Sequence, residues 1–71
     1  MSDEGIEIQV NGEARRVPGG ASVADLLEQL DVDGGAVVVE LNRQIVRRNE
    51  REDVSLEPGD RVELVRFVGG G

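Results

Sequence analysis

The residues best suited to chemistry stand at the end of this sequence, where three glycines, Gly69, Gly70 and Gly71, follow Val68. Glycine has no Cβ, so such a run neither packs in a core nor favours a helix or strand. A terminal carboxylate becomes an acyl donor once a partner with ATP converts it to an acyl-adenylate, which then reacts with sulfur or an amine. Without side chains, the tail suits a narrow channel. We predict that Gly71 or Gly70 carries the reactive acyl group and that Gly69 belongs to the tail.

The rest of the chain offers no catalytic set. It contains no Cys and no His, which excludes a thiol nucleophile, an imidazole base and a disulfide. The serines, at positions 2, 22 and 55, have neither His nor Lys to activate them. No Asp-x-Asp-x-Asp-Gly loop indicates a metal site. The sequence therefore predicts a carrier or substrate rather than an enzyme, with no metal and no bound cofactor.

Length and charge narrow the class of protein further. A chain of 71 residues makes one domain, which we place at residues 1–68, followed by the glycine tail at 69–71. The formal charge is -7, which argues against nucleic acid and anionic membranes as partners. No apolar stretch is long enough to span a bilayer, and the N-terminus does not resemble a signal peptide. We expect a soluble cytoplasmic protein that is monomeric when free.

The start of the chain is typical of a β-hairpin. Alternating apolar residues predict a strand over 6–10, and the Asn-Gly pair at 11–12 is a strong hairpin signal. A two-residue turn would pair Ile8 with Arg15, whereas a four-residue loop would pair Ile8 with Val17. Because register follows the hydrophobic pattern, we expect the four-residue loop.

A helix follows the hairpin. Ser22 is a good N-cap for the backbone N–H of Asp25, whose own charge suits the first turn. Apolar residues recur at helical spacing, at Val23, Leu26, Leu27 and Leu30. We expect about three turns that end at Gly34-Gly35 and cover one face of a sheet.

The second half of the chain is predicted to add strands to that sheet. The apolar run 36–41 indicates a central strand, buried over most of its length. After it we expect a turn at 42–43, a short strand at 45–46, a charged loop at 47–53, a type II turn at 57–60 and a last strand at 61–68. The fold class is therefore α+β: a roll in which one helix crosses one face of a mixed four- to five-stranded sheet.

The same pattern predicts a docking face. If Val62 and Leu64 face the helix, Val65 lies on the other face of the sheet, beside Val38 of the neighbouring strand. The single aromatic residue, Phe67, precedes the tail closely, and we interpret it as a docking anchor, although a place in the core is the alternative. The predicted docking residues are Val38, Val65, Arg66 and Phe67, because aromatic and Arg side chains are favoured at binding hot spots.

The order of these features resembles a known family. The matching stretches are Ile8-Gln9-Val10-Asn11-Gly12, residues 22–30, Leu41-Asn42-Arg43-Gln44-Ile45-Val46, Gly59-Asp60-Arg61-Val62-Glu63-Leu64-Val65 and the terminal glycines. Together they are similar to the ubiquitin-like β-grasp sulfur carriers, above all the ThiS family of thiamine biosynthesis. There are two departures: Arg47 or Arg48 stands where the family usually has Pro, and the chain ends in three glycines rather than two.

The resemblance implies a function for the tail. An E1-like adenylyltransferase of the ThiF or MoeB kind, using ATP and Mg²⁺, would adenylate the last glycine, and sulfur transfer would give a thiocarboxylate. The departure at the tail implies that either Gly71 reacts or its removal leaves Gly70 as the reactive end. The acceptor would be a thiazole synthase, a molybdopterin synthase or a tRNA thiolation enzyme. Two alternatives remain. One is a ubiquitin-like protein modifier, or an archaeal-type protein that is both a modifier and a sulfur carrier for molybdopterin or tRNA thiolation. The other is a β-grasp binding module whose tail is inert.

Overall fold

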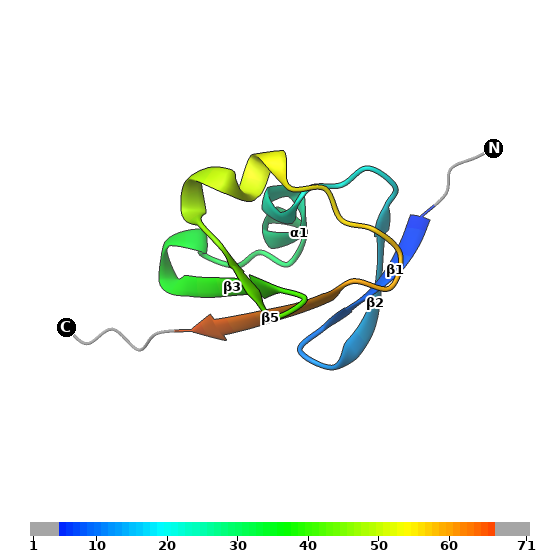
Figure 1. Ribbon diagram of the computed structural model, residues 1–71, viewed down its shortest axis with the longest axis horizontal. Coiled ribbons are helices and arrows are strands. Elements are labelled where there is room, and N and C mark those ends of the chain that lie inside the picture. Colours follow the sequence, from blue (N-terminus) through cyan, green and yellow to red (C-terminus); the bar gives the residue numbers. More distant parts are fainter. Residues whose placement is uncertain (1–4, 67–71) are drawn as a thin grey trace.

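The computed structural model describes residues 5–66, and over that part of the chain it shows an α+β fold (Figure 1). The elements are, in chain order, β1 (Gly5–Val10), β2 (Glu13–Pro18), α1 (Val23–Gln29), the 3₁₀ helix η1 (Gly34–Ala36), β3 (Val37–Leu41), β4 (Gln44–Val46), the 3₁₀ helix η2 (Arg48–Asp53) and β5 (Arg61–Arg66). The order of strands and helix agrees with the order predicted from the sequence.

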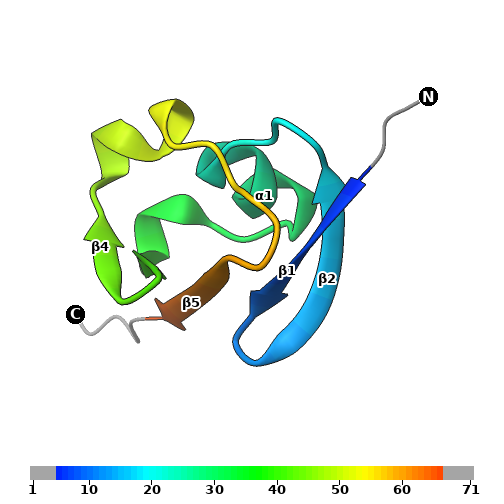
Figure 2. The ribbon, with the colours of Figure 1, turned by 45° about the vertical axis from the view of Figure 1, so that its right-hand side comes forward.

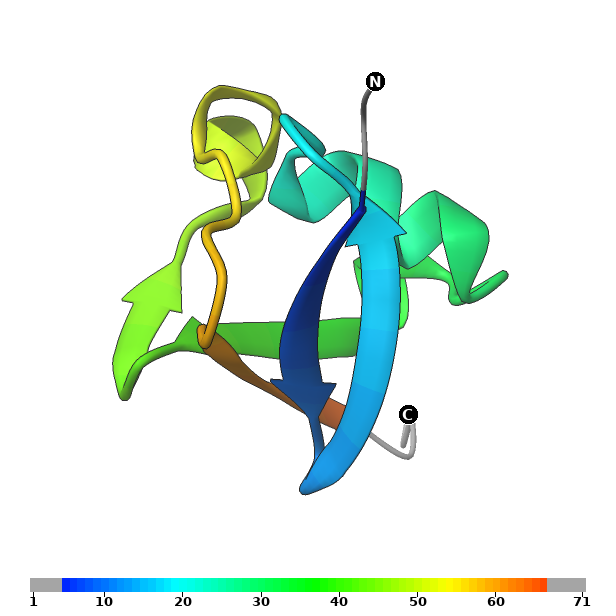
Figure 3. The ribbon, with the colours of Figure 1, turned by 90° about the vertical axis from the view of Figure 1, so that its right-hand side faces the viewer.

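The five strands form one mixed sheet in the order β2-β1-β5-β3-β4. The strand β5 runs parallel to β1 and antiparallel to β3. The helix α1 lies on one side of the twisted sheet, as Figure 2 and Figure 3 show. This arrangement confirms the predicted β-grasp roll.

The centre of the sheet is β5, so the prediction of a central strand at residues 36–41 is wrong. The corresponding strand, β3, lies between β5 and the edge strand β4. Only Val37 and Val39 of β3 are buried, because the side chains between them face away from α1. The apolar run therefore corresponds to an interior strand of the sheet whose side chains are buried only on the face toward α1.

The core is aliphatic and lies between α1 and the sheet. Its most deeply buried side chains are Ile8, Val17, Val23, Leu26, Val39 and Val62. The helix contributes Val23, Leu26 and Leu27, three positions of the predicted stripe, while Leu30 is partly buried against the same cluster. Helical spacing thus identified the buried face of α1 correctly.

The β1–β2 hairpin has a two-residue turn and pairs Ile8 with Arg15, so the predicted four-residue loop is wrong. Asn11 and Gly12 have φ angles of 51° and 86°, the pair of positive values that a type I′ turn requires. Arg15 is tolerated opposite Ile8 because β2 is an edge strand, from which the guanidinium extends into solvent. Turn geometry outweighs the hydrophobic match between Ile8 and Val17.

The helix begins as predicted but ends earlier. The Ser22 Oγ accepts the Asp25 N–H, and the Asp25 carboxylate accepts the Ser22 N–H, each at 3.0 Å. The helix has seven residues rather than three turns, because Asp31 adopts a left-handed φ of 59° directly after Leu30. The predicted stop, Gly34-Gly35, lies instead in η1.

The predicted charged loop at 47–53 is largely η2 and includes one buried cation. Arg51 is 7% exposed, and its guanidinium donates to the Gly34 oxygen at 2.8 Å and to the Val37 oxygen at 3.0 Å. These bonds join η2 to the start of β3. The predicted loop is therefore wrong over Arg48–Asp53, where the chain forms a 3₁₀ helix, and the burial of Arg51 follows from its bonds to the Gly34 and Val37 carbonyls.

The remaining turns agree with the sequence. The Asp60 N–H donates to the Glu57 oxygen at 3.1 Å, which closes the turn at 57–60. Asn42 and Arg43 both have positive φ and join β3 to β4. The last strand is described from Arg61 to Arg66, and the two further residues predicted for it lie outside the described part of the chain.

Candidate functional site

The face of the sheet that turns away from α1 carries a small apolar surface. Side chains alternate along β5, so Val62 and Leu64 face the helix while Val65 faces outward. Val65 is 53% exposed and is paired with Val38 of β3. The two valines lie side by side on the outer face, as the sequence predicts. Their role in docking stays a prediction.

A third apolar side chain extends this surface, and sequence reasoning missed it. Ile45 of β4 is 65% exposed and stands opposite Glu40, so it is a diagonal neighbour of Val38. The signal was present, because Val46 faces the core and neighbouring residues of a strand face opposite ways. We call Val38, Ile45 and Val65 the outer patch.

Charged side chains border the outer patch. Glu40 and Glu63 stand directly opposite each other on β3 and β5. They line a hollow of about 590 Å³ together with Asn42, Arg43 and Arg61. Like charges in opposed positions are destabilising. Arg43 and Arg61 line the same hollow and add two positive charges to it. The outer face therefore combines an apolar half with a half of mixed charge.

Arg66, another predicted docking residue, does not share a face with Val65. It is exposed and paired with Val37 of β3, at the end of the described strand. As the next residue after Val65, it projects from the opposite face of the sheet. The structure thus separates Arg66 from the outer patch.

The remaining predicted site residues are Phe67 and the glycines Gly69, Gly70 and Gly71. All of them lie outside the described residues. The described strand β5 leads directly into that segment of the sequence. Val65, the last residue of the outer patch, therefore stands two positions before the predicted anchor, Phe67.

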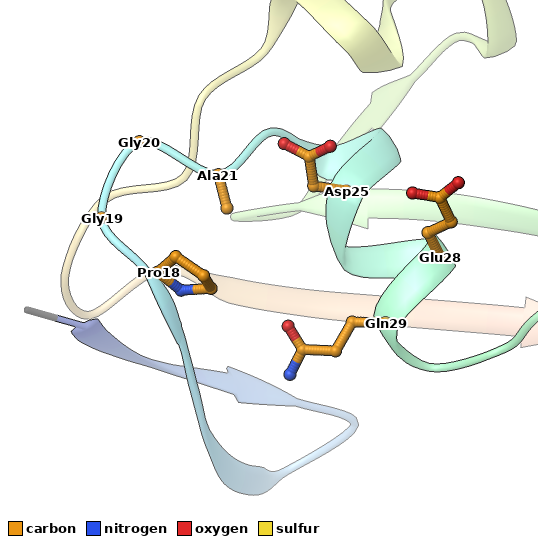
Figure 4. Close-up of a pocket in the computed structure, with 7 residues that line it drawn as sticks. All are labelled: Pro18, Gly19, Gly20, Ala21, Asp25, Glu28 and Gln29. Carbon is orange, nitrogen blue, oxygen red and sulfur yellow. The ribbon is translucent and has the colours of Figure 1, made fainter.

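A further hollow, of about 580 Å³, lies between the β2–α1 connection and the helix (Figure 4). Its polar side chains come from α1, namely Asp25, Glu28 and Gln29. The Asp25 carboxylate is engaged in the helix cap, and the Gln29 amide donates to the Arg16 oxygen at 3.4 Å. Two of these three groups thus serve the fold, and the hollow offers no assembled chemistry.

Residues 5–66 contain neither a metal-binding cluster nor a membrane-spanning helix. No group of three or more Asp and Glu side chains is placed to hold a metal ion there. No helix in the same range is long and apolar enough to cross a membrane. The surface that remains as a functional candidate is the outer patch with the chain that follows it.

Comparison with known proteins places the chain in a family. The sequence model of the ThiS family matches residues 8–71, which is most of the chain and includes the glycines. The chain belongs to the ThiS family. Among ThiS relatives, the sulfur carrier protein ThiS of Escherichia coli is 32% identical, over 93% of this chain and 100% of that protein.

A solved ThiS structure supports the fold. The crystal structure of the thiamine biosynthesis protein ThiS from Geobacter metallireducens superposes with a TM-score of 0.80 at 35% identity, covering 93% of this chain and all of that one. A thiazole synthase from Paramagnetospirillum magneticum is 38% identical over 93% of this chain. The chain spans only 20% of the length of that relative.

Proposed function

We propose that this chain is a sulfur carrier for formation of the thiazole ring of thiamine. The observation that carries the proposal is the match of the ThiS family model over residues 8–71, which reaches through the terminal glycines. The full-length similarity to a protein named sulfur carrier protein ThiS supports the same role. The chain is then a substrate of other enzymes and catalyses no step itself.

The reactive group in this proposal is the carboxylate of Gly71, or of Gly70 if Gly71 is first removed. An E1-like adenylyltransferase joins this carboxylate to the α-phosphate of ATP, and pyrophosphate leaves with Mg²⁺. Hydrosulfide from the sulfur donor then attacks the carbonyl carbon and displaces AMP, so that the product is a C-terminal thiocarboxylate. The absence of Cys, His and Lys from the chain supports this division of labour, because the common nucleophiles must come from the partner.

We further propose a thiazole synthase as the acceptor of the sulfur. Proteins named thiazole synthase contain a segment similar to this chain, in Paramagnetospirillum magneticum and in Magnetococcus marinus. One polypeptide that holds both parts is consistent with two parts that act together. The outer patch and Phe67 are the proposed docking surface, since exposed apolar groups on a small domain favour a partner.

The test is to incubate the purified chain with an E1-like adenylyltransferase, ATP and a sulfur donor, and to measure its intact mass. We expect the mass increase of one oxygen-to-sulfur exchange. A chain lacking Gly70 and Gly71 should stay unmodified and melt at the same temperature. If the wild-type mass never changes, the carrier role fails. Tail-dependent conjugates of higher mass would instead indicate a protein modifier.

The outer patch is tested in the same assay. Val65→Asp places a charge in the middle of the proposed contact and should lower the rate of thiocarboxylate formation about tenfold or more. Glu52→Gln, an exposed substitution on η2, serves as the control and should leave the rate unchanged. Equal rates for the two variants would exclude the outer patch as the docking surface.

A further inference from the structure

The central strand β5 extends past the hairpin that pairs with it (Figure 1). The ladder between β1 and β5 has only two pairs, Gln9 with Arg61 and Val10 with Val62. Beyond these two pairs a side chain replaces the backbone as the partner of β5: the Asn11 Oδ1 accepts the Leu64 N–H at 2.8 Å. The hairpin turns back at this point, while β5 continues to Arg66.

The hydrogen-bonding direction of each residue on β5 follows from these contacts. The Arg61 oxygen accepts the Asn42 N–H at 2.8 Å, so the odd-numbered residues direct their backbone groups toward β3. The Val62 oxygen accepts the Asn11 N–H at 2.9 Å, so the even-numbered residues face the hairpin side. The Leu64 carbonyl and the Arg66 backbone groups therefore point to an edge that lies beyond the tip of the hairpin.

A groove accompanies this edge on the side of the helix. It measures about 360 Å³, and its lining residues are Val10, Asn11, Glu13, Arg15, Leu30, Val32 and Leu64. Leu30, Val32 and Leu64 are partly buried, so an apolar surface remains open there. The Glu13 and Arg15 side chains from β2 supply one charge of each sign. When a peptide adds to a sheet as an extra strand, free backbone groups at the edge bond to it and a nearby pocket receives its side chains. The edge of β5 and this groove offer both features in one place.

We propose that the edge of β5 at Leu64–Arg66 accepts an extended segment of the activating enzyme as an added strand, with one apolar side chain of that segment in the groove. This inference rests on the proposed function, because β5 leads directly into the residues that the activating enzyme must hold. A segment of the same enzyme beside β5 would fix the direction in which the following glycines leave the domain.

The test compares two substitutions of Arg66 in the full-length chain. Arg66→Pro removes the N–H at the open edge and leaves the ladder with β3 intact, because that N–H points away from β3. Arg66→Ala removes the same side chain but keeps the N–H. We expect Arg66→Pro to bind the E1-like adenylyltransferase about tenfold more weakly than Arg66→Ala, with both variants melting within a few degrees of the wild type. Equal affinities would overturn the proposal.

Amide hydrogen exchange of the wild-type chain tests the proposal without a substitution. Binding of the same adenylyltransferase should slow exchange at the Arg66 N–H, and the Asp31 N–H, which donates to the Glu28 oxygen at the end of α1, serves as the internal reference. Unchanged exchange at Arg66 in the complex would overturn strand addition. If the wild type is adenylated but Arg66 shows neither effect, the carrier role stands and only this inference fails. If the wild type is never adenylated, both fail.

Discussion

At the scale of single residues, Arg51 shows how one side chain connects two segments that the sheet leaves apart. Its guanidinium bonds to the Gly34 and Val37 oxygens, at the entry to β3. Its Nε is buried without a partner in the described part of the chain, so the site is not fully satisfied. Even so, two charge-assisted bonds at a 7% exposed position should contribute clearly to folding.

Replacing Arg51 with Met keeps most of the buried stem and removes the donors. We expect a loss of about 2–4 kcal/mol in the free energy of unfolding, because two carbonyls lose a charged partner in a buried place. Urea denaturation followed by circular dichroism measures it. Arg48→Met is the matched control, since Arg48 is exposed and its bond to the Gly35 oxygen is 3.4 Å long. A similar loss of unfolding free energy in both variants would show that the bonds of Arg51 to Gly34 and Val37 add no particular stability.

Asn11 has two roles that one substitution separates. It adopts a positive φ in the hairpin turn, and its Oδ1 holds the Leu64 N–H. Asn11→Ala should lower the free energy of unfolding by about 1–3 kcal/mol, because both roles are lost. Asn11→Asp keeps an acceptor and tolerates the backbone, so it should lose less than half as much. Thermal unfolding of the two variants measures these changes. Equal losses of unfolding free energy in Asn11→Ala and Asn11→Asp would contradict the two roles given to Asn11.

At the scale of elements, short helices depend on their ends. The helix α1 has seven residues, so its reciprocal cap at Ser22 and Asp25 is a large part of its local stability. The loop that contains Ser22 also forms an isolated bridge to Ser55, which ties the start of α1 to the segment after η2.

Ser22→Ala should therefore destabilise the domain by about 1 kcal/mol. Ser22→Asp keeps an acceptor at the N-cap and is expected to stay within a few tenths of the wild type. The measurement is the midpoint of urea unfolding, compared between variants whose free energy of unfolding falls with urea concentration at the same slope. An unchanged midpoint for Ser22→Ala would mean that packing alone sets the start of α1.

Much of this element structure follows from the sequence because local signals and the core agree. Helical spacing and the Ser22 cap located α1, and strand alternation placed Val65 beside Val38. The errors arose where a local preference depended on distant contacts. Arg51 finds its acceptors only once η1 and β3 come together, and Arg15 is accepted opposite Ile8 only because β2 is an edge. The order of strands in a sheet likewise leaves little trace in any single segment.

At the scale of the molecule, charge is the dominant property. The chain has 15 acidic residues against 8 basic ones. Such an imbalance favours solubility and attracts basic partner surfaces, but its self-repulsion opposes the compact state. Opposed carboxylates at Glu40 and Glu63 place part of that repulsion within the sheet itself.

We therefore expect the melting temperature to rise when salt is added. Screening shortens the reach of the repulsion from about 30 Å at 0.01 M to about 8 Å at 0.15 M ionic strength. Differential scanning calorimetry over that range measures the effect. Glu63→Gln removes one member of the opposed pair and should raise the melting temperature at low salt while reducing its salt dependence. A melting temperature that falls with salt would show that ion pairs outweigh repulsion.

The position of β5 in the chain has a consequence for synthesis on the ribosome. This strand lies between β1 and β3, yet it is the last described strand to be made. A chain interrupted before Arg61 leaves β1 and β3 with no strand to join them, and Val62 is missing from the core. Such a fragment cannot close the sheet, so we expect the domain to fold only once β5 has been made, and shortened chains to be degraded more readily than whole ones.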